Sequence, residues 1–238
     1  MTIEIRLNDA LDLDLIRETY GQFGRIHIPG VLDAGSADLV YNALKDEVPW
    51  QTHFNEGEKS YDLHDKQLEA LSESDRVQLK NKLTMNAATR FQYLFRNYPV
   101  SDAIEQGNNP DQSIHAFQEF VNSEAVLDFI RTITGIEEIR FADCQATLYE
   151  PGHFLTVHND DVDQAGRLVA YVFSFTPGWR PDFGGMLMFL DDDGHVEEGY
   201  MPDFNSLNLF TIPKKHCVSY VAPFAPGGRY SLSGWFRD

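Results

Sequence analysis

The chain has 238 residues, of which 42% are hydrophobic and 13% aromatic, enough to bury a sizeable core in one large domain or two small ones. Its formal net charge of −18 repels phosphate backbones and anionic lipids, which argues against nucleic acids and membrane surfaces as partners. A basic or neutral substrate fits this charge better, although an acidic surface that only keeps the protein soluble has the same composition.

Targeting and redox signals point to a cytoplasmic protein. The first residues, MTIEIRLNDALDLDL, are acidic and have neither the basic start nor the apolar centre of a secretory signal. The longest strongly apolar run, residues 168–175, is far shorter than a membrane span. Cys144 and Cys217 are too few for a disulfide framework and have no CxxC spacing, so we expect a reducing compartment.

The first part of the chain, residues 16 to about 136, has mostly the apolar periodicity of helices. Serines suited to capping precede three of these periodic segments, and Gly135 is suited to ending the last one. The predicted helices follow Ser36, run from 72 to about 91 with Val77, Leu79, Leu83 and Phe91, pass through 117–121, and occupy 123–133.

After Ile139 the pattern changes to short segments rich in β-branched and aromatic residues, separated by Pro and Gly turns. The predicted strands lie in IRFADCQATLY, HFLTVH, RLVAYVFSF, GMLMFL, LNLFTI, HCVSYV and RYSLSGWF. This spacing is typical of a jelly roll or barrel. Because the chain has no repeat, low-complexity tract or linker, we predict a single α+β domain over 1–238, with a mainly helical part (1–138) packed against a jelly-roll core (139–238).

The segment TVHND contains a candidate metal motif. On a strand, His158 and Asp160 project to the same face while Asn159 points away. His216, in KKHCVSY, lies far enough along the chain for several strands to cross the core and return. Two histidines and one carboxylate form the open-sided ligand set of non-haem iron(II) oxygenases. An HxD pair alone is common, however, and a strand histidine is more often a packing or surface residue.

The last strand contains a candidate anion site. In RYSLSGWF, Arg229, Ser231 and Ser233 alternate and therefore share one face. A guanidinium fork beside hydroxyls is suited to holding a carboxylate through two parallel hydrogen bonds. The alternative is an arginine on the surface of an edge strand.

Together these motifs resemble the prolyl hydroxylase branch of the iron(II) and 2-oxoglutarate dioxygenases, including the enzymes that hydroxylate a proline of a small-subunit ribosomal protein and their bacterial relatives. The resemblance lies in LYEPGHFLTVHND, RLVAYVFSFTPGW, FGGMLMFL, NSLNLF, HCVSYV and RYSLSGWF, with a looser match in GRIHIPGVLDAGSADLVYNAL, which is similar to the family's first strand and helix. It implies a double-stranded β-helix (jelly roll, cupin-like) core. It also implies hydroxylation of a C–H bond with Fe(II), 2-oxoglutarate and O2, ascorbate as a supporting reductant, and succinate and CO2 as co-products.

The resemblance also implies roles for individual residues. His158, Asp160 and His216 match the metal ligands, and Arg229 matches the residue that pairs with the distal carboxylate of 2-oxoglutarate. Arg167 matches a substrate-side arginine. The other residues expected in the co-substrate pocket are Tyr149, Leu187, Ser231 and Ser233. Ser174 stands where related enzymes commonly have a tyrosine that reaches the same carboxylate.

Several alternatives stay open. The substrate is a prolyl residue of a protein or, as a variant, a free amino acid or other small metabolite. A protein of another class, a non-redox cupin-like metal-binding protein, would use the same three ligands without a dicarboxylate anchor, so Arg229 separates the two classes. His195 and Glu197 form an HxE pair in an acidic segment that we interpret as a loop, and Asp161 and Asp163 either belong to a solvated loop or receive a basic substrate.

The sequence gives little support for metal binding by the other histidines or for other classes of enzyme. Five histidines lack a second ligand at strand or helix spacing, so packing or surface roles are expected for His27, His53, His64, His115 and His153. The chain has no GxSxG, no Walker-type loop and no GxGxxG, which leaves serine acyl transfer, nucleotide hydrolysis and nicotinamide chemistry without support.

Overall fold

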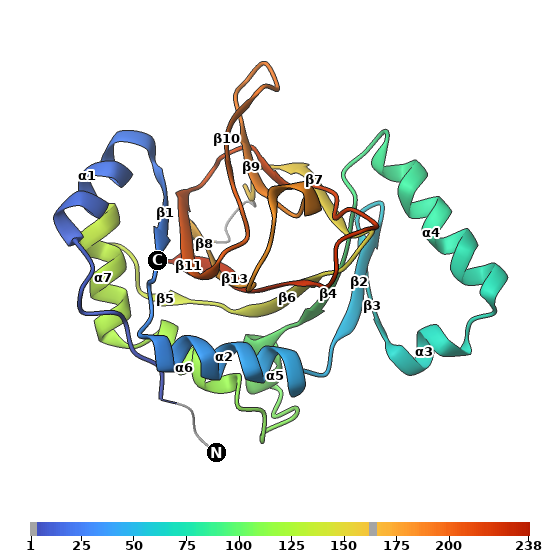
Figure 1. Ribbon diagram of the computed structural model, residues 1–238, viewed down its shortest axis with the longest axis horizontal. Coiled ribbons are helices and arrows are strands. Elements are labelled where there is room, and N and C mark those ends of the chain that lie inside the picture. The colour runs from blue at the N-terminus through green and yellow to red at the C-terminus, as the bar shows by residue number, and fades with distance from the viewer. Residues whose placement is uncertain (1–3, 162–165) are drawn as a thin grey trace.

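The computed structural model describes residues 4–161 and 166–238, whose strands form one 13-stranded antiparallel sheet (Figure 1). Its main path runs β1-β11-β8-β13-β6-β4-β7-β12-β9-β10, and β2, β3 and β5 attach beside it. The strands are β1 (Arg25–Pro29), β2 (Gln51–Glu56), β3 (Lys59–His64), β4 (Tyr93–Tyr98), β5 (Phe141–Ala142), β6 (Gln145–Tyr149), β7 (Phe154–His158), β8 (Arg167–Phe175), β9 (Leu187–Leu190), β10 (Val196–Tyr200), β11 (Phe204–Thr211), β12 (His216–Val218) and β13 (Arg229–Arg237).

The sheet folds back on itself at β4. This strand pairs with β6 on one part of its length and with β7 on another, through Tyr93↔Leu155 and Leu94↔Phe154. The larger layer, β1-β11-β8-β13-β6, therefore lies across from the smaller layer, β7-β12-β9-β10, and Figure 1 shows the nearly closed barrel that results. The predicted α+β fold with a jelly-roll core is confirmed.

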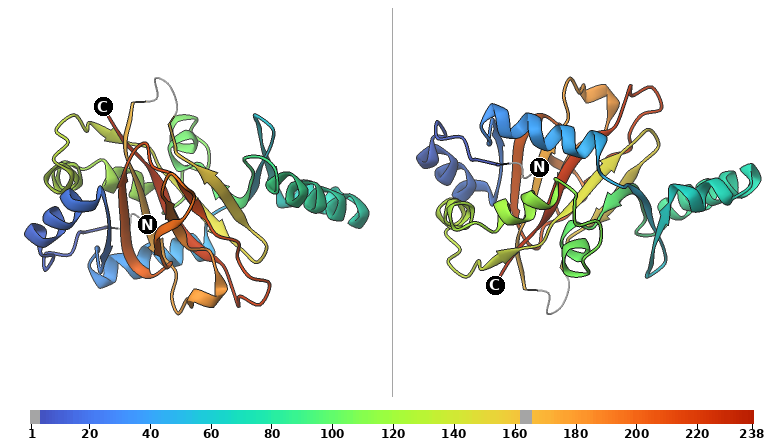
Figure 2. Two further views of the ribbon diagram at one scale, coloured as in Figure 1. Left: turned by 90° about the horizontal axis from the view of Figure 1, so that it is seen from above. Right: turned by 90° about the horizontal axis from the view of Figure 1, so that it is seen from below.

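Helices flank the sheet, and most of them cover the outer face of the larger layer (Figures 1 and 2). They are α1 (Leu13–Phe23), α2 (Ala34–Asp46), α3 (Asp65–Ala70), α4 (Glu73–Ala87), α5 (Val100–Glu105), α6 (His115–Val121) and α7 (Glu124–Thr134), with a short 3-10 helix at Pro181–Phe183. Among the described residues, none of these helices combines the length and the apolarity that crossing a bilayer would require.

Alternation along the strands separates the core from the barrel interior. On β8, Phe173 and Phe175 are fully buried and face the helices, where Phe117 of α6 packs edge-on against both rings. Ala170 and Val172, on the opposite face of the same strand, line the cavity inside the barrel. The helices therefore support the wall of the barrel without closing its interior.

The amino-terminal part is less purely helical than predicted, because it also contributes β1 to β4. Only β1, in GRIHIP, was expected as a strand. The helix predicted over 72 to about 91 is shorter: α4 ends at Ala87, and Phe91 lies beyond it, just before β4. The apolar periodicity gave a wrong end for this helix because α4 is mostly exposed to solvent, so its apolar residues do not mark a buried face. Leu83 is its one buried residue. Figure 2 shows α3 and α4 projecting away from the barrel.

Two local predictions also need correction. Asp33, not Ser36, caps α2: its carboxylate accepts from the Ser36 backbone N–H at 3.0 Å, and Ser36 lies in the first turn. The segment interpreted as a loop around His195 and Glu197 contains β10, which pairs with β9. The caps at Ser72 and Ser123 and the end at Gly135 are confirmed.

We expect Phe173→Ala to lower the free energy of unfolding by about 3–5 kcal/mol, because it leaves a cavity between β8 and α6 that the packed rings cannot fill. Phe224→Ala is the matched control, since this ring is 68% exposed and its loss should change stability by less than about 1 kcal/mol. Urea denaturation followed by circular dichroism measures both. Equal effects of the two substitutions would contradict this assignment of the core.

Candidate functional site

Three side chains with metal-ligating atoms meet at the barrel wall. His158 ends β7 and His216 begins β12, and the two residues are direct partners in the antiparallel register. Their ring centroids lie 4.1 Å apart. Asp160 follows β7, with Oδ1 3.3 Å from His158 Nε2 and Oδ2 3.5 Å from His216 Nε2. One potential ligand atom from each residue lies within 4.8 Å of the others.

Backbone carbonyls orient both imidazoles. His158 Nδ1 lies 3.0 Å from the Thr156 carbonyl and His216 Nδ1 lies 2.7 Å from the Lys214 carbonyl. Because a carbonyl oxygen can only accept, each neutral ring places its proton on Nδ1 and its lone pair on Nε2, the atom that faces Asp160. Such a backbone contact is the usual means of orienting a metal-binding histidine.

Burial and charge favour the protonation states that bind metal. Burial, together with the neighbouring His158, lowers the pKa of His216 to about 4, so its imidazole is neutral near neutral pH. For Asp160, burial acts to raise the pKa, but the neighbouring His158 and His216 outweigh it, and its pKa lies below the ordinary value. The cluster therefore offers a carboxylate at Asp160 and a neutral imidazole at His216.

These three residues line a cavity of about 580 Å³ inside the barrel, and Arg229 lines the same cavity. Arg229 begins β13, is 3% exposed, and stands opposite Tyr149 of β6, whose ring centroid is 5.0 Å from the guanidinium carbon. Burial lowers the pKa of this guanidinium. Among the residues that the structure describes, none forms a hydrogen bond or an ion pair with Arg229, and its Nε is buried without a partner.

The structure places the other predicted co-substrate residues around the same cavity. Its lining includes Tyr149, Leu187, Ser231 and Ser233. Ser231 Oγ is 2.8 Å from Thr147 Oγ1, and both residues are buried. Thr147 is a pocket residue that the sequence analysis missed, because its place beside Ser231 depends on the pairing of β6 with β13.

Ser174 lies next to the cavity but is not part of its lining. It is fully buried and is the cross-strand partner of both Ser231 and Ser206. Within the described part of the chain its hydroxyl has no hydrogen-bond partner. Its comparison with the tyrosine of related enzymes stays a prediction.

The cavity lining also contains Arg167, the predicted substrate-side arginine, whose guanidinium carbon lies 3.5 Å from the centroid of the Trp235 ring. Asp161 also lines the cavity, whereas Asp163 lies outside the described residues. Strands β2 to β4 and the residue Phe91 before β4 contribute lining residues that the sequence analysis did not place there: His53, Ser60, Phe91 and Tyr93. His53 was assigned a packing or surface role, and its ring does stack on Tyr93 at 4.7 Å.

The second motif, His195 and Glu197, does not form a metal cluster in the described chain. Glu197 is instead paired with Lys214 at 2.5 Å and Arg25 at 3.2 Å. His195 is exposed on the turn that leads into β10.

Comparison with known proteins supports the interpretation of the cluster as an iron site. Residues 144–237 match the family model of the 2OG-Fe(II) oxygenase superfamily. The chain is 26% identical over 164 residues to mouse "Prolyl 3-hydroxylase OGFOD1"; the alignment covers 66% of this chain but only 29% of that relative.

Solved structures share the fold over nearly the whole chain. A Pseudomonas putida prolyl-4-hydroxylase superposes with a TM-score of 0.57 and 19% identity, covering 94% of this chain and 98% of its own. A Trichoplax adhaerens prolyl hydroxylase, in complex with a hypoxia inducible factor oxygen degradation domain peptide fragment, has a TM-score of 0.61 and 16% identity, with 95% and 89% covered. At these identities the likeness establishes the fold alone.

We expect His158→Ala, Asp160→Ala and His216→Ala each to weaken binding of Fe(II) or Co(II) by more than about 100-fold, since removing a ligand should cost more than removing a residue that orients one. Anaerobic titration calorimetry measures the affinity. His195→Ala is the control, because this exposed histidine lies outside the cluster, and it should bind the metal like the wild type. Unchanged affinity in any of the three ligand variants would contradict the assignment.

Proposed function

We propose that the chain is a member of the 2OG-Fe(II) oxygenase superfamily, whose family model matches residues 144–237, and that it is a dioxygenase that hydroxylates a C–H bond of its substrate while converting 2-oxoglutarate and O2 to succinate and CO2. One observation carries the proposal: among the described residues, the buried Arg229 has no hydrogen-bond or ion-pair partner, and it lines the same cavity as the His158, Asp160 and His216 cluster.

The cluster fits Fe(II). Two neutral imidazole nitrogens and one carboxylate oxygen form the ligand set typical of non-haem iron(II) oxygenases, which leaves the remaining coordination positions open. The chemistry that Fe(II) supplies when bound is the activation of O2, coupled to oxidation of the keto acid. The contribution of the chain is to hold the three ligand atoms on one wall of the cavity and to keep His216 unprotonated.

Arg229 fits a dicarboxylate. A buried charge costs several kcal/mol unless it is paired, so an unpaired guanidinium facing a cavity favours an anionic ligand. In 2-oxoglutarate one carboxylate and the keto oxygen can chelate a metal, and the distal carboxylate remains for Arg229. Tyr149 and Ser231 lie beside Arg229 and restrict where that carboxylate can sit. A cupin-like protein that only binds metal would have no need of this guanidinium.

The substrate we propose is a prolyl residue in a protein or peptide with basic neighbours. Support comes from three sources: the likeness to prolyl hydroxylases, the aromatic rings of Phe91, Tyr93 and Trp235 in the cavity lining, and the net charge of −18. Aromatic rings offer an apolar surface to a pyrrolidine ring, and Asp161 in the same lining offers a charge to a basic flank.

We also propose a reducing, cytoplasmic setting. Cys144 and Cys217 are both buried free thiols, and burial raises the pKa of Cys144 to about 12, which keeps its thiol protonated and unreactive.

The test of the function is anaerobic addition of Fe(II) and then 2-oxoglutarate, with the visible charge-transfer band of the chelate as the readout. Succinate formation under O2 is then compared for proline peptides with basic flanks, the same peptides with acidic flanks, and free amino acids. We expect the basic peptides to be turned over best, with a rate that falls as salt screens their attraction. Efficient turnover of a free amino acid, at a rate that does not change with salt, would contradict the proposed protein substrate and favour a small metabolite.

We expect Arg229→Lys to raise the KM for 2-oxoglutarate tenfold to a hundredfold. Lysine keeps the charge but cannot make two parallel hydrogen bonds to one carboxylate, and a charged hydrogen bond contributes about 1.5–3 kcal/mol. Fe(II) affinity measured without 2-oxoglutarate should stay unchanged, because Arg229 is not part of the ligand cluster. A variant that loses iron while its KM stays normal would show that Arg229 supports the metal site or the fold instead.

A further inference from the structure

Trp235 of β13 makes the hydrogen bond on which this inference rests. Its indole Nε1–H donates to Asp160 Oδ2 at 3.0 Å. We propose that Trp235 is a positioning residue for the metal site, which holds the Asp160 carboxylate in the orientation that binds the ion. The inference rests on the proposed function, because it assigns Asp160 to the metal.

Asp160 is a residue that needs such a restraint. Its backbone has φ 59°, in the left-handed region that is costly for a residue with a side chain. It lies beyond the end of β7, so no strand pairing fixes it. Hydrogen bonds to its side chain and backbone therefore decide where its carboxylate points. Arg167 makes the backbone contact, from Nη1 to the Asp160 carbonyl at 3.4 Å.

The indole is itself held from several sides. The Trp235 backbone N–H donates to Asp143 Oδ1 at 2.8 Å, and the Asp143 carboxylate is also paired with Arg237. Arg167 covers one face of the indole, with its guanidinium carbon 3.5 Å from the ring centroid. At Gly234 a Cβ atom would lie 2.1 Å from the Asp143 carbonyl oxygen, so only glycine allows β13 to approach Asp143 this closely.

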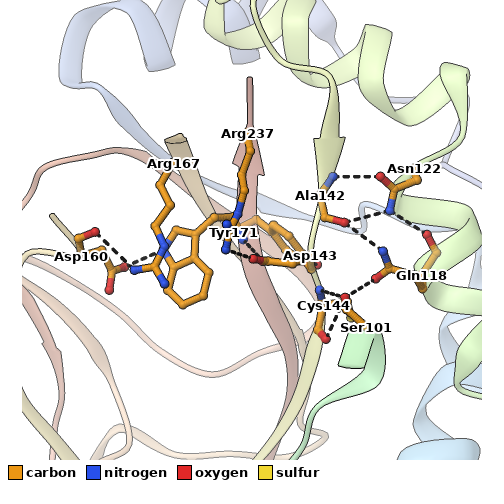
Figure 3. A network of polar contacts seen from close by, with 11 residues as sticks. Ser101, Gln118, Asn122, Ala142, Asp143, Cys144, Asp160, Arg167, Tyr171 and Arg237 are labelled. Carbon is orange, nitrogen blue, oxygen red and sulfur yellow. Dashed lines mark hydrogen bonds and ion pairs between the residues drawn. The ribbon is translucent and has the colours of Figure 1, made fainter. Parts of the chain in front are cut away.

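The restraint extends to the helical layer (Figure 3). Tyr171 donates its hydroxyl to the Asp143 carbonyl at 2.7 Å, and the next residue, Cys144, donates its backbone N–H to Ser101 Oγ at 2.7 Å. Ser101 in turn donates to Gln118 of α6 at 2.9 Å. A chain of polar contacts therefore runs from α5 and α6 through Asp143 and Trp235 to the Asp160 carboxylate.

The hydrogen bond also makes the two carboxylate oxygens unequal. Oδ2 accepts from Trp235, whereas Oδ1 lies 3.3 Å from His158 Nε2 with no such donor. A lone pair of Oδ2 is thus engaged, which leaves Oδ1 as the oxygen better placed to bind a cation alone. An Asp160 without this donor would be free to turn, and would present a less defined ligand to the metal.

The chain offers a matched control in Trp179. Its indole Nε1–H also donates to an oxygen, the Gly184 carbonyl at 2.8 Å. Trp179 is buried and Trp235 is partly buried. It does not line the cavity and does not touch the metal cluster. Replacing either tryptophan by phenylalanine removes one indole donor, but only Trp235→Phe removes it from a proposed metal ligand.

The experiment is anaerobic titration of Trp235→Phe, Trp179→Phe and the wild type with Co(II) in the absence of 2-oxoglutarate. We expect Trp235→Phe to bind about 10- to 100-fold more weakly, the usual effect of losing a partner of a metal ligand, and Trp179→Phe to bind like the wild type. The visible d–d bands of bound Co(II) report its coordination geometry, and they should change in Trp235→Phe alone.

Several outcomes would overturn the proposal. One is a folded Trp235→Phe protein, checked by circular dichroism, with wild-type affinity and an unchanged Co(II) spectrum; another is an equal loss in Trp179→Phe. If Trp235→Phe does not fold, 3-benzothienylalanine at position 235 keeps the two-ring shape without the N–H, and must show the same loss. A wild type that binds Co(II) but turns over no 2-oxoglutarate would overturn the proposed function, while the comparison of variants would still decide the role of Trp235.

Discussion

The pairing of β12 with β7 is the contact on which the site depends. It sets His216 directly opposite His158, and backbone carbonyls two residues before each histidine turn both Nε2 atoms toward Asp160. Neither strand is long: β12 has three residues and β7 has five. Their position is maintained by their neighbours, since β12 also pairs with β9 and β7 also pairs with β4. The closure of the barrel, rather than any one strand, therefore brings the ligand atoms together.

Charge is distributed in opposite ways inside and outside the barrel. The chain is strongly acidic overall, yet the cavity contains a buried guanidinium that no described residue neutralises. Burying Arg229 costs the hydration free energy of its charge, and an anionic ligand would recover part of that free energy. The carboxylate of Asp160, by contrast, has two histidines and an indole N–H around it. Within one cavity, Arg229 thus lacks an anion and the ligand cluster lacks a cation, and a metal-chelating dicarboxylate would supply the anion.

The helical part of the chain supports the site from the outer face of the sheet. Phe117 of α6 packs against the outer face of β8, and Ser101 and Gln118 hold the segment that contains Asp143. Strands β2 to β4, from the same part, contribute side chains to the cavity lining. The amino-terminal residues therefore serve both as support for the ligand cluster and as part of the surface that a substrate meets.

Spacing within one segment was enough to predict part of the site. The period of two along a strand put Arg229, Ser231 and Ser233 on one face, and turn residues divided the carboxyl-terminal half into strands. The same period predicted that His158 and Asp160 converge; they do, but Asp160 lies beyond the end of β7 with φ 59°, so strand alternation is not what places it. Tertiary structure alone decided which segments meet. The positions of Thr147 beside Ser231, of Trp235 beside Asp160, and of Tyr93 in the cavity lining all depend on contacts between residues far apart in the chain. Local periodicity cannot specify these contacts, because register and closure depend on the packing of the whole barrel.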